Sequence, residues 1–376
     1  MKVLQKNKKL CVGIIFGGKS TEHEVSLQSA KNIIEAIDKK KYKVVLIGID
    51  KKGKWYLTKD SRFLLHADNP KLIKLNRSND KVILILGEKA KQLICSSSHR
   101  TVGPIDVIFP VLHGPYGEDG TIQGFLKIAD IPFVGTDVLG SAISMDKEIT
   151  KRLLLEAGIP SVKFFTLHHS SIKQISFKTV KNKLGLPFFI KPANMGSSIG
   201  INKVKNKEQF ALFLKEAFQY DNKILIEEAI KGREIECAVL GNENPIASLP
   251  GEIIPQYEFY SYKAKYLDDK GAILKIPAEL SSKIATQIQN LSVKVFKLLE
   301  CKGMARVDFF LKNNQEIIVN ELNTIPGFTK ISMYPKLWEV SGISYSQLID
   351  RLIQLALKKF KEKERIKTSF ICDTSG

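Results

Sequence analysis

Two patterns of apolar and polar positions alternate along the chain, one typical of buried strands and the other of amphipathic helices. Leu10–Phe16 and Val44–Ile49 are strand-sized apolar runs. Between them, apolar residues recur at the spacing of one helix face, at Leu27, Ala30, Ile34 and Ile37. Ahead of this helix, Thr21-x-x-Glu24 has the spacing of a capping box. The pattern predicts a β-α-β start and a parallel sheet, because parallel neighbours must be joined by a crossover.

The alternation continues through the rest of the chain and predicts an α/β (α+β) fold. Strands are predicted at Val82–Leu86, Val107–Val111, Phe188–Lys191, Ile199–Val204, Ile224–Glu228 and Glu234–Leu240. Helices are predicted over Lys207–Tyr220, over an apolar face that runs from Ile284 to Leu298, and over Ser344–Lys359. Asp146 is the expected cap of a further helix, which Gly158-Ile159-Pro160 ends. Residues 50–105 are lysine-rich and give no clear pattern beyond the first of these strands.

Composition narrows the class of protein. Apolar residues make up 44% of the 376 residues and charged residues 26%, which is ordinary for a globular protein and excludes disorder. No apolar run approaches the roughly 18 residues of a membrane span. The five cysteines lie far apart without a C-x-x-C pair, so we expect reduced thiols in a cytoplasmic protein. The 58 Lys and Arg against 39 Asp and Glu give a formal net charge of +19, which alone identifies no ligand.

A hairpin near the C-terminus brings candidate metal ligands together. The segment Lys312-Asn313-Asn314-Gln315 has a two-residue turn signal. Pairing its first and last residues places Arg306 opposite Glu321 and Asp308 opposite Val319. In this register Met304 faces Asn323, and all the partners named share one side of the sheet, because opposite residues point the same way.

Asp308, Glu321 and Asn323 would therefore converge on one patch beside the Arg306 guanidinium. Three hard oxygen ligands next to a cation suit Mg²⁺ that bridges phosphate oxygens. The alternative is a solvated polar strand face that contains an ordinary Arg–Glu pair.

Several loops carry further candidate chemistry. The small-residue loop from Lys191 to Gly200 could let backbone N–H groups approach an anion, with Lys147 and Lys265 as additional phosphate contacts. Ordinary turns and chance placement among many lysines remain the alternative. The tyrosines and lysines of the loop Gln256–Asp269 resemble a single-stranded nucleic-acid surface, but they fit a lid over a ligand equally well. The loops 17–24 and 113–120 hold titratable groups between strand and helix signals.

Taken together, the ordered motifs resemble the D-alanine–D-alanine ligase family of the ATP-grasp superfamily. The resemblance spans residues 11 to about 335 and rests on Gly17-Gly18-x-Ser20-x-Glu22-His23-Glu24, His113-Gly114-x-x-Gly117-Glu118-Asp119-Gly120, Met145-Asp146-Lys147, Lys191-Pro192, Gly196-Ser197-Ser198-x-Gly200, Gly232-Arg233-Glu234, Tyr260-x-Tyr262-x-Ala264-Lys265-Tyr266, Arg306-x-Asp308 and Glu321-x-Asn323-Thr324-x-Pro326-Gly327. It implies three domains: an N-terminal Rossmann-like substrate-binding domain over 1–136, a central ATP-grasp subdomain over 137–227, and a C-terminal ATP-grasp and Mg²⁺-binding domain over 228–365. A flexible tail is expected over 366–376.

The resemblance also implies roles for individual residues. A set of catalytic residues would hold the first D-alanine and stabilise the intermediate: Glu22, Ser197, Tyr266, His113 and Arg306. Glu22 would bind the ammonium of that D-alanine, and His113 would lie near its carboxylate. Contacts with ATP would come from Lys147, Lys191, Ser198, Glu227, Ile230, Glu234 and Lys265. Asp308, Glu321 and Asn323 would bind two Mg²⁺, which Mn²⁺ could replace. The second D-alanine would meet Gly327, Ser332 and Met333.

The implied activity is ATP-dependent ligation of two D-alanines through a D-alanyl phosphate, which supplies peptidoglycan precursors. The implied partners are ATP and D-alanine, with a homodimer expected and neither nucleic acid nor membrane involved. Tyr266 goes with the dipeptide product in the family. The alternatives are a D-alanine–D-lactate ligase, another ATP-grasp carboxylate–amine ligase, and a nucleic-acid-binding protein suggested by the +19 charge.

Overall fold

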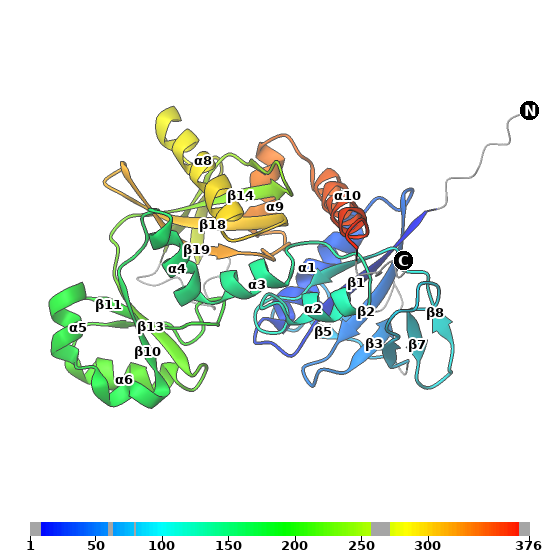
Figure 1. Ribbon diagram of the computed structural model, residues 1–376, viewed down its shortest axis with the longest axis horizontal. Coiled ribbons are helices and arrows are strands. Elements are labelled where there is room, and N and C mark those ends of the chain that lie inside the picture. Colours follow the sequence, from blue (N-terminus) through cyan, green and yellow to red (C-terminus); the bar gives the residue numbers. More distant parts are fainter. Residues whose placement is uncertain (1–8, 59–62, 79, 257–270, 368–376) are drawn as a thin grey trace, which may run out of the picture.

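The computed structural model describes residues 9–58, 63–78, 80–256 and 271–367, with the side chains of 173 and 174 left out. The elements form three lobes, each built around its own sheet (Figure 1). The expected lid loop, with Lys265 and Tyr266, lies outside the described residues, as does nearly all of the expected tail. Among the described cysteines, four are free and buried, as predicted: Cys11, Cys95, Cys237 and Cys301. In the described parts, every helix is too short or too polar to cross a membrane.

The N-terminal lobe contains the predicted β-α-β start. Its main sheet has the order β3-β2-β1-β9, with β1 parallel to both β2 and β9. The bounds are β1 (Leu10–Gly17), α1 (His23–Ala36), β2 (Tyr42–Ile49), β3 (Trp55–Thr58) and β9 (Val107–Val111). The predicted capping box is wrong, because the residue before α1 is Glu22 and its side chain makes no capping hydrogen bond. The Glu22 carboxylate instead faces the candidate site described below.

The lysine-rich segment 50–105 forms small antiparallel additions to this lobe. Its short strands are β4 (Leu64–Leu65), β5 (Lys74–Leu75), β6 (Val82–Leu84), β7 (Leu93–Cys95) and β8 (Thr101–Val102). Three helices follow: α2 (Thr121–Ile128), α3 (Val138–Met145) and α4 (Lys147–Glu156). Asp146 caps α4 as predicted, because its carboxylate accepts hydrogen bonds from the N–H groups of Glu148 and Ile149.

The central lobe is a four-stranded antiparallel sheet with the order β10-β13-β11-β12. Its elements are β10 (Phe164–His168), the 3₁₀ helix η1 (His169–Gln174), α5 (Phe177–Leu184), β11 (Phe188–Pro192), β12 (Asn202–Val204), α6 (Lys207–Ala217) and β13 (Lys223–Glu228). Helices α5 and α6 pack on this sheet over a core that includes Val180, Phe188 and Phe210. Figure 1 shows this lobe standing apart from the N-terminal sheet.

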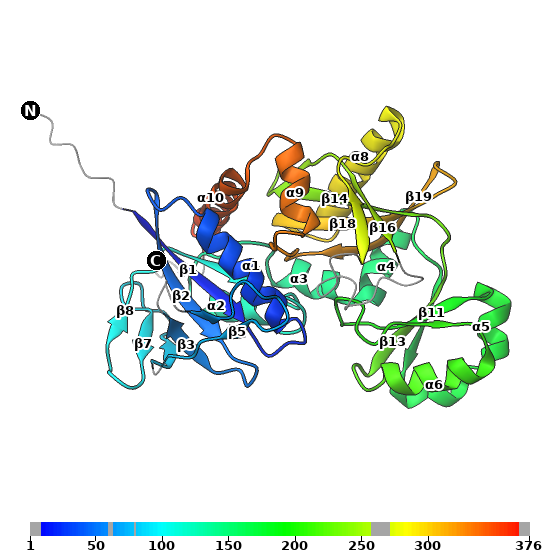
Figure 2. The same ribbon diagram turned by 180° about the vertical axis from the view of Figure 1, so that it is seen from behind.

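The C-terminal lobe has the sheet order β17-β16-β14-β18-β19, with β15 beside β14. The bounds are β14 (Arg233–Gly241), β15 (Ile246–Ala247), β16 (Gly251–Pro255), β17 (Ala272–Lys275), α8 (Ser282–Leu298), β18 (Gly303–Lys312), β19 (Glu316–Asn323), α9 (Met333–Val340) and α10 (Tyr345–Lys363). Residues Ile235, Cys237 and Val239 of β14 pack with α8. The alternate residues Ala238 and Leu240 share a core with α9, α10 and the N-terminal sheet. Helix α10 thus joins two lobes (Figure 2).

The register of the β18–β19 hairpin differs from the prediction. Lys312 pairs with Glu316, because the turn holds three residues, and a bulge follows Asp308. Asp308 therefore faces Glu321, and Arg306 faces Asn323. The extra turn residue and the bulge together shift the pairing by two positions. Since side chains alternate with a period of two, this shift leaves the predicted residues on one face.

Candidate active site

A cavity of about 530 Å³ opens between the central and C-terminal sheets. It is lined by nine of the predicted site residues: Lys147, Lys191, Ser197, Ser198, Glu227, Ile230, Glu234, Glu321 and Asn323. These residues come from α4, from β11 and the loop after it, from β13 and the loop after it, and from β14 and β19. The cavity is therefore assembled from segments far apart in sequence, as the ordered motifs predicted.

The loop between β11 and β12 reaches the N-terminal lobe at one end of this cavity. Ser197 Oγ donates a hydrogen bond to Glu22 Oε1. A Cβ at Gly196 would stand only 2.7 Å from Glu22 Oε2, so the loop backbone approaches the carboxylate closely. The predicted Glu22–Ser197 pair is brought together, while its expected third member, Tyr266, lies outside the described residues.

Glu118 is a site residue that the sequence reasoning did not single out. Its Oε2 accepts a hydrogen bond from the Gly114 N–H at 2.8 Å, and its Oε1 accepts one from the Ile325 N–H at 3.0 Å. Burial and the neighbouring Glu22 carboxylate raise the pKa of Glu118 to about 8. Glu118 also lines the cavity. The signal that could have identified it is its place in the motif at 113–120.

A buried cluster of three charges forms one wall. Glu227 lies between two ammonium groups, with Lys191 Nζ at 2.6 Å and Lys151 Nζ at 3.3 Å from its oxygens. The side chains of Lys151 and Glu227 are each 1% exposed. Proximity to the two lysines outweighs burial and lowers the pKa of Glu227 to about 2. Lys151 also donates to the Asn320 carbonyl of β19, so it links β13 to β19. Sequence reasoning missed Lys151, because a helical lysine ordinarily points to solvent.

Lys147 is held at the start of α4 by two neighbours. Its Nζ donates to the Met195 carbonyl at 2.6 Å, and its backbone N–H donates to the Ala193 carbonyl at 3.1 Å. Both acceptors belong to the β11–β12 segment that carries Ser197 and Ser198. The phosphate-binding lysine predicted from the sequence therefore sits directly beside the small-residue loop.

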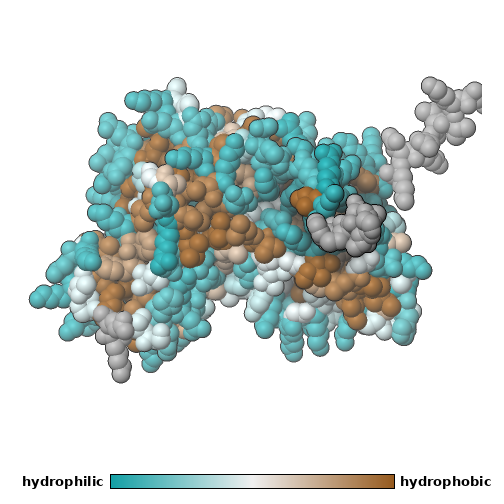
Figure 3. Space-filling view, viewed as in Figure 1, coloured by the Kyte–Doolittle hydropathy of each residue, from teal (hydrophilic) through white to brown (hydrophobic). Residues whose placement is uncertain are grey.

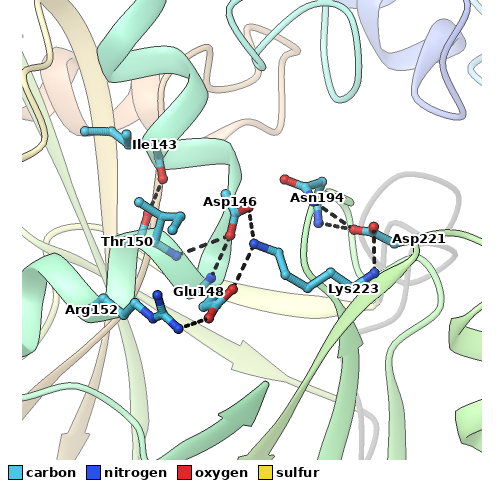
Figure 4. A network of polar contacts seen from close by, with 9 residues as sticks. Ile143, Asp146, Glu148, Thr150, Arg152, Asn194, Asp221 and Lys223 are labelled. Atoms are coloured by element: carbon cyan, nitrogen blue, oxygen red, sulfur yellow. Dashed lines mark hydrogen bonds and ion pairs between the residues drawn. The ribbon is translucent and has the colours of Figure 1, made fainter. Parts of the chain in front are cut away.

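A network of ion pairs and hydrogen bonds surrounds the start of α4 (Figure 4). Lys223, at the start of β13, reaches Asp146 Oδ2 at 2.5 Å and Glu148 Oε2 at 2.9 Å. Arg152 Nη2 contacts Glu148 at 2.6 Å from the other side. Asp221 accepts hydrogen bonds from the backbone N–H and the side-chain amide of Asn194 at 2.8 and 3.0 Å. The network ties α4 to the start of β13 and, through Asp221, to the segment that follows β11.

The predicted metal ligands share one face of the C-terminal sheet. Arg306 donates to both oxygens of Asp308, at 2.7 and 2.6 Å, and approaches Glu236 at 2.9 Å. Asn323 Nδ2 donates to Asp308 Oδ2 at 3.0 Å. Glu321 stands opposite Asp308 in the register and lines the cavity.

These side chains fit a hard divalent cation by donor type. Among the described residues, no three His, Cys, Asp or Glu side chains form a metal-binding group. The predicted set therefore depends on the amide oxygen of Asn323 as its third donor. Arg306 balances the charge of Asp308.

The predicted acceptor residues lie where β19 turns into α9. A Cβ at Gly327 would stand 2.7 Å from Ser332 Oγ, so the two residues are in close contact. Ser332 Oγ turns back to the Thr329 N–H at 3.0 Å and does not cap α9. The Met333 side chain is buried toward Gly251 of β16.

His113 lies at the base of the same turn. It is 4% exposed, and its two ring nitrogens contact the Ile325 carbonyl at 3.0 Å and Ser29 Oγ at 3.1 Å. Burial lowers the pKa of His113 to about 4. The imidazole is therefore neutral at physiological pH.

Comparison with known proteins gives consistent matches along the chain. The family described as D-ala D-ala ligase N-terminus matches residues 11–136, and that described as D-ala D-ala ligase C-terminus matches residues 153–354. The chain is 56% identical over 358 residues to the D-alanine–D-alanine ligase of Oceanobacillus iheyensis, covering 95% of this chain and 98% of the relative. It is 51% identical over 362 residues to D-alanine–D-alanine ligase A of Escherichia coli K12, covering 96% and 100%.

Solved structures match over the same length. The D-alanine–D-alanine ligase from Coxiella burnetii has a TM-score of 0.82 at 39% identity, with 95% of this chain and 96% of that chain covered. The VanG D-Ala:D-Ser ligase from Enterococcus faecalis has a TM-score of 0.81 at 37% identity, with 93% and 100% covered. The ligase from Bacillus anthracis complexed with ATP has a TM-score of 0.70 at 28% identity, with 94% and 99% covered. The chain belongs to the D-alanine–D-alanine ligase family and has the predicted ATP-grasp fold.

Proposed function

We propose that the protein joins two D-alanines to D-alanyl-D-alanine with conversion of ATP to ADP and phosphate, and that the product serves peptidoglycan precursor synthesis. The observation that carries this proposal is the meeting of three groups around one cavity. The Glu22–Ser197 pair, the lysines at 147 and 191, and the oxygen ligands on β18 and β19 come from three different sheets and their connections. An ammonium, a polyphosphate and a divalent cation are the ligands that these groups suit.

In the first step, an oxygen of the D-alanine carboxylate attacks the γ-phosphorus of ATP. The bond from that phosphorus to the β–γ bridging oxygen breaks, ADP leaves, and D-alanyl phosphate forms. The free carboxylate is a poor acyl donor, whereas phosphate is a good leaving group. Lys147 and Lys191 supply charge for the transferring phosphoryl group from fixed positions, and we propose that Ser198 and Lys265 join them.

Glu227, Ile230 and Glu234 are proposed to line the adenine and ribose part of the ATP site. All three line the cavity. Glu227 also fixes Lys191 through a 2.6 Å ion pair, which supports a second, orienting contribution to phosphate binding.

Asp308, Glu321 and Asn323 are proposed to hold two Mg²⁺, which Mn²⁺ could replace. When bound, the ions would offset negative charge on the phosphate oxygens. The Arg306 guanidinium stands beside these ligands and is proposed to stabilise the oxyanion of the later tetrahedral adduct.

In the second step, the neutral amine of the second D-alanine attacks the acyl carbon, the bond from carbon to phosphate breaks, and phosphate leaves. The amine proton passes to a base or to water. Gly327, Ser332 and Met333 are proposed to hold this acceptor at the turn before α9. Glu22 and Ser197 hold the donor ammonium, and Tyr266 is proposed to complete that group.

We also propose which compound serves as the acceptor, the second substrate. D-Alanine is favoured over D-serine or D-lactate, because the relatives of higher identity are D-alanine–D-alanine ligases and the D-Ala:D-Ser ligase is 37% identical. The test is phosphate release from ATP and Mg²⁺ across D- and L-amino acids and D-hydroxy acids. We expect release that depends on D-alanine, with dipeptide as the product. Faster turnover with D-lactate near neutral pH would contradict this choice.

We further propose a cytoplasmic homodimer with no nucleic-acid or membrane partner, and domains over 1–136, 137–227 and 228–365. Sedimentation of the purified protein tests the dimer. Salt-sensitive binding to random oligonucleotides without ATP turnover would instead favour the nucleic-acid alternative.

A further inference from the structure

Residues 325–328 form a turn whose first residue is held by the N-terminal lobe. The Ile325 N–H donates to Glu118 Oε1 at 3.0 Å. The Ile325 carbonyl contacts His113 Nδ1 at 3.0 Å. Both main-chain polar groups of Ile325 are thus bound by side chains of the loop after β9, which is distant in sequence.

The last residue of the turn is held in the same way by two helices. The Phe328 N–H donates to Ser29 Oγ at 3.1 Å. The Phe328 carbonyl accepts from Asn32 Nδ2 at 2.9 Å and from Tyr345 Oη at 2.7 Å. Gly327, the proposed acceptor contact, lies between these two anchored residues.

The directions of the hydrogen bonds follow from the chemistry of the groups. The Ile325 carbonyl can only accept, so His113 Nδ1 must carry the proton of the neutral ring. His113 Nε2 is then an acceptor, and it takes the hydroxyl proton of Ser29. Ser29 Oγ remains free to accept from the Phe328 N–H. One continuous chain of hydrogen bonds therefore joins both ends of the turn through two buried side chains.

We propose that Ser29 is a positioning residue for the acceptor D-alanine. Through His113 and Phe328 it fixes the turn 325–328, so that Gly327 is presented to the acceptor in one place. Both ring nitrogens of His113 are engaged within the protein, so His113 acts through the turn and exchanges no proton with substrate. The inference deepens the proposed function and rests on it.

The kinetic test compares Ser29→Ala with Ser292→Ala. Both serines are 0% exposed, but Ser292 donates to Ile288 of its own helix, α8, in the C-terminal lobe, and makes a side-chain hydrogen bond with Cys237 of the same lobe. Initial rates over a wide range of D-alanine yield separate Michaelis constants for donor and acceptor. For Ser29→Ala we expect the acceptor constant to rise about tenfold, with the donor and ATP constants within about twofold of wild type. Equal changes in all three constants, or a change no larger than in Ser292→Ala, would overturn the proposal.

A second measurement keeps the test independent of catalysis. Hydrogen exchange of the Phe328 amide should be at least about tenfold faster in Ser29→Ala than in wild type, and unchanged in Ser292→Ala. Ser29→Cys, which preserves the side-chain size but hydrogen-bonds weakly, should also accelerate exchange and provides a folded variant if Ser29→Ala is unstable. Unchanged exchange of the Phe328 amide in both Ser29 variants would overturn the proposal that Ser29 holds the turn. If the wild-type protein shows no D-alanine-dependent phosphate release, only the proposed function is refuted. Hydrogen exchange of the Phe328 amide still tests whether Ser29 holds the turn.

Discussion

Glu227 is a buried carboxylate whose charge is balanced by two lysines. Lys151 has its Nζ within 3.3 Å of Glu227 and is itself 1% exposed, so the charges depend on each other for compensation. Removing one partner of a buried ion pair leaves an uncompensated charge in a low-dielectric interior.

We therefore predict that Glu227→Gln lowers the free energy of unfolding by about 3–5 kcal/mol. The adjacent Glu228→Gln is the control, since Glu228 is partly exposed and accepts a hydrogen bond from the Lys163 N–H at 2.9 Å. Urea denaturation measures both variants. Equal losses at the two positions would show that the charge cluster contributes no special stability.

Glu118 gives a pH dependence whose sign can be worked out. In the folded protein its pKa is raised to about 8 from an ordinary value of 4.5. Folded Glu118 therefore keeps a proton that the unfolded chain releases between these values, so its contribution to stability is full below pH 4.5 and declines as the pH rises through 8.

We predict that the free energy of unfolding of wild type relative to Glu118→Gln falls between pH 5 and pH 8. Urea denaturation at a series of pH values checks this difference. A difference that is constant or rises over the interval would contradict the assignment of a raised pKa.

At the scale of elements, the connection between α4 and β13 positions the phosphate lysines. Lys223 contacts Asp146 and Glu148 at the start of α4, one position on either side of Lys147 (Figure 4). Without Lys223, the neighbouring carboxylates of Asp146 and Glu148 would lose the ammonium that they share, and α4 would lose one of its ties to the central sheet.

Lys223→Met should therefore raise the KM for ATP by roughly three- to tenfold, with a smaller effect on the D-alanine constants. Lys215→Met on the exposed side of α6 is the matched control. Steady-state kinetics with varied ATP measures both variants. An ATP KM that is the same in the two variants would rule out a positioning contribution from Lys223.

The hairpin illustrates what sequence patterns can and cannot predict. The strands, the turn and the shared face of Asp308, Glu321 and Asn323 were predictable, because hairpin signals and side-chain alternation are local. The three-residue turn and the bulge after Asp308 were not, because they depend on how β18 pairs with β14 on one side and with β19 on the other. Lys151 and Ser29 were missed for the same reason: their partners lie on elements distant in sequence.

At the scale of the whole molecule, one core joins the N-terminal and C-terminal lobes through α10. Apolar side chains of β1, β9, α9 and α10 pack together, and Lys359 of α10 donates to the Gly135 carbonyl at 2.7 Å. The order of the motifs predicted the ATP-grasp fold, but no local pattern indicated that the last helix returns to the first sheet. The turn 325–328, which is proposed to position the acceptor, lies between these joined lobes.

The net charge of +19 comes from many basic residues, of which only a few are proposed to act on substrate. On the face in Figure 3, hydrophilic side chains cover the outer edges, while hydrophobic side chains show in the middle. Lys147, Lys191 and Arg306 are the described basic residues proposed to act on substrate, and carboxylates or carbonyls hold all three. The position of a few cations, rather than the total charge, supports the proposed function.

The central claim is that D-alanine is activated as an acyl phosphate in the cavity shared by the three lobes. The most direct test uses D-alanine with ¹⁸O in its carboxylate, together with ATP and Mg²⁺, and mass spectrometry of the products. Attack on the γ-phosphorus predicts that one labelled oxygen appears in the released phosphate and none in ADP, with formation of D-alanyl-D-alanine. Label in a nucleotide product, or dipeptide formed with unlabelled phosphate, would contradict the account.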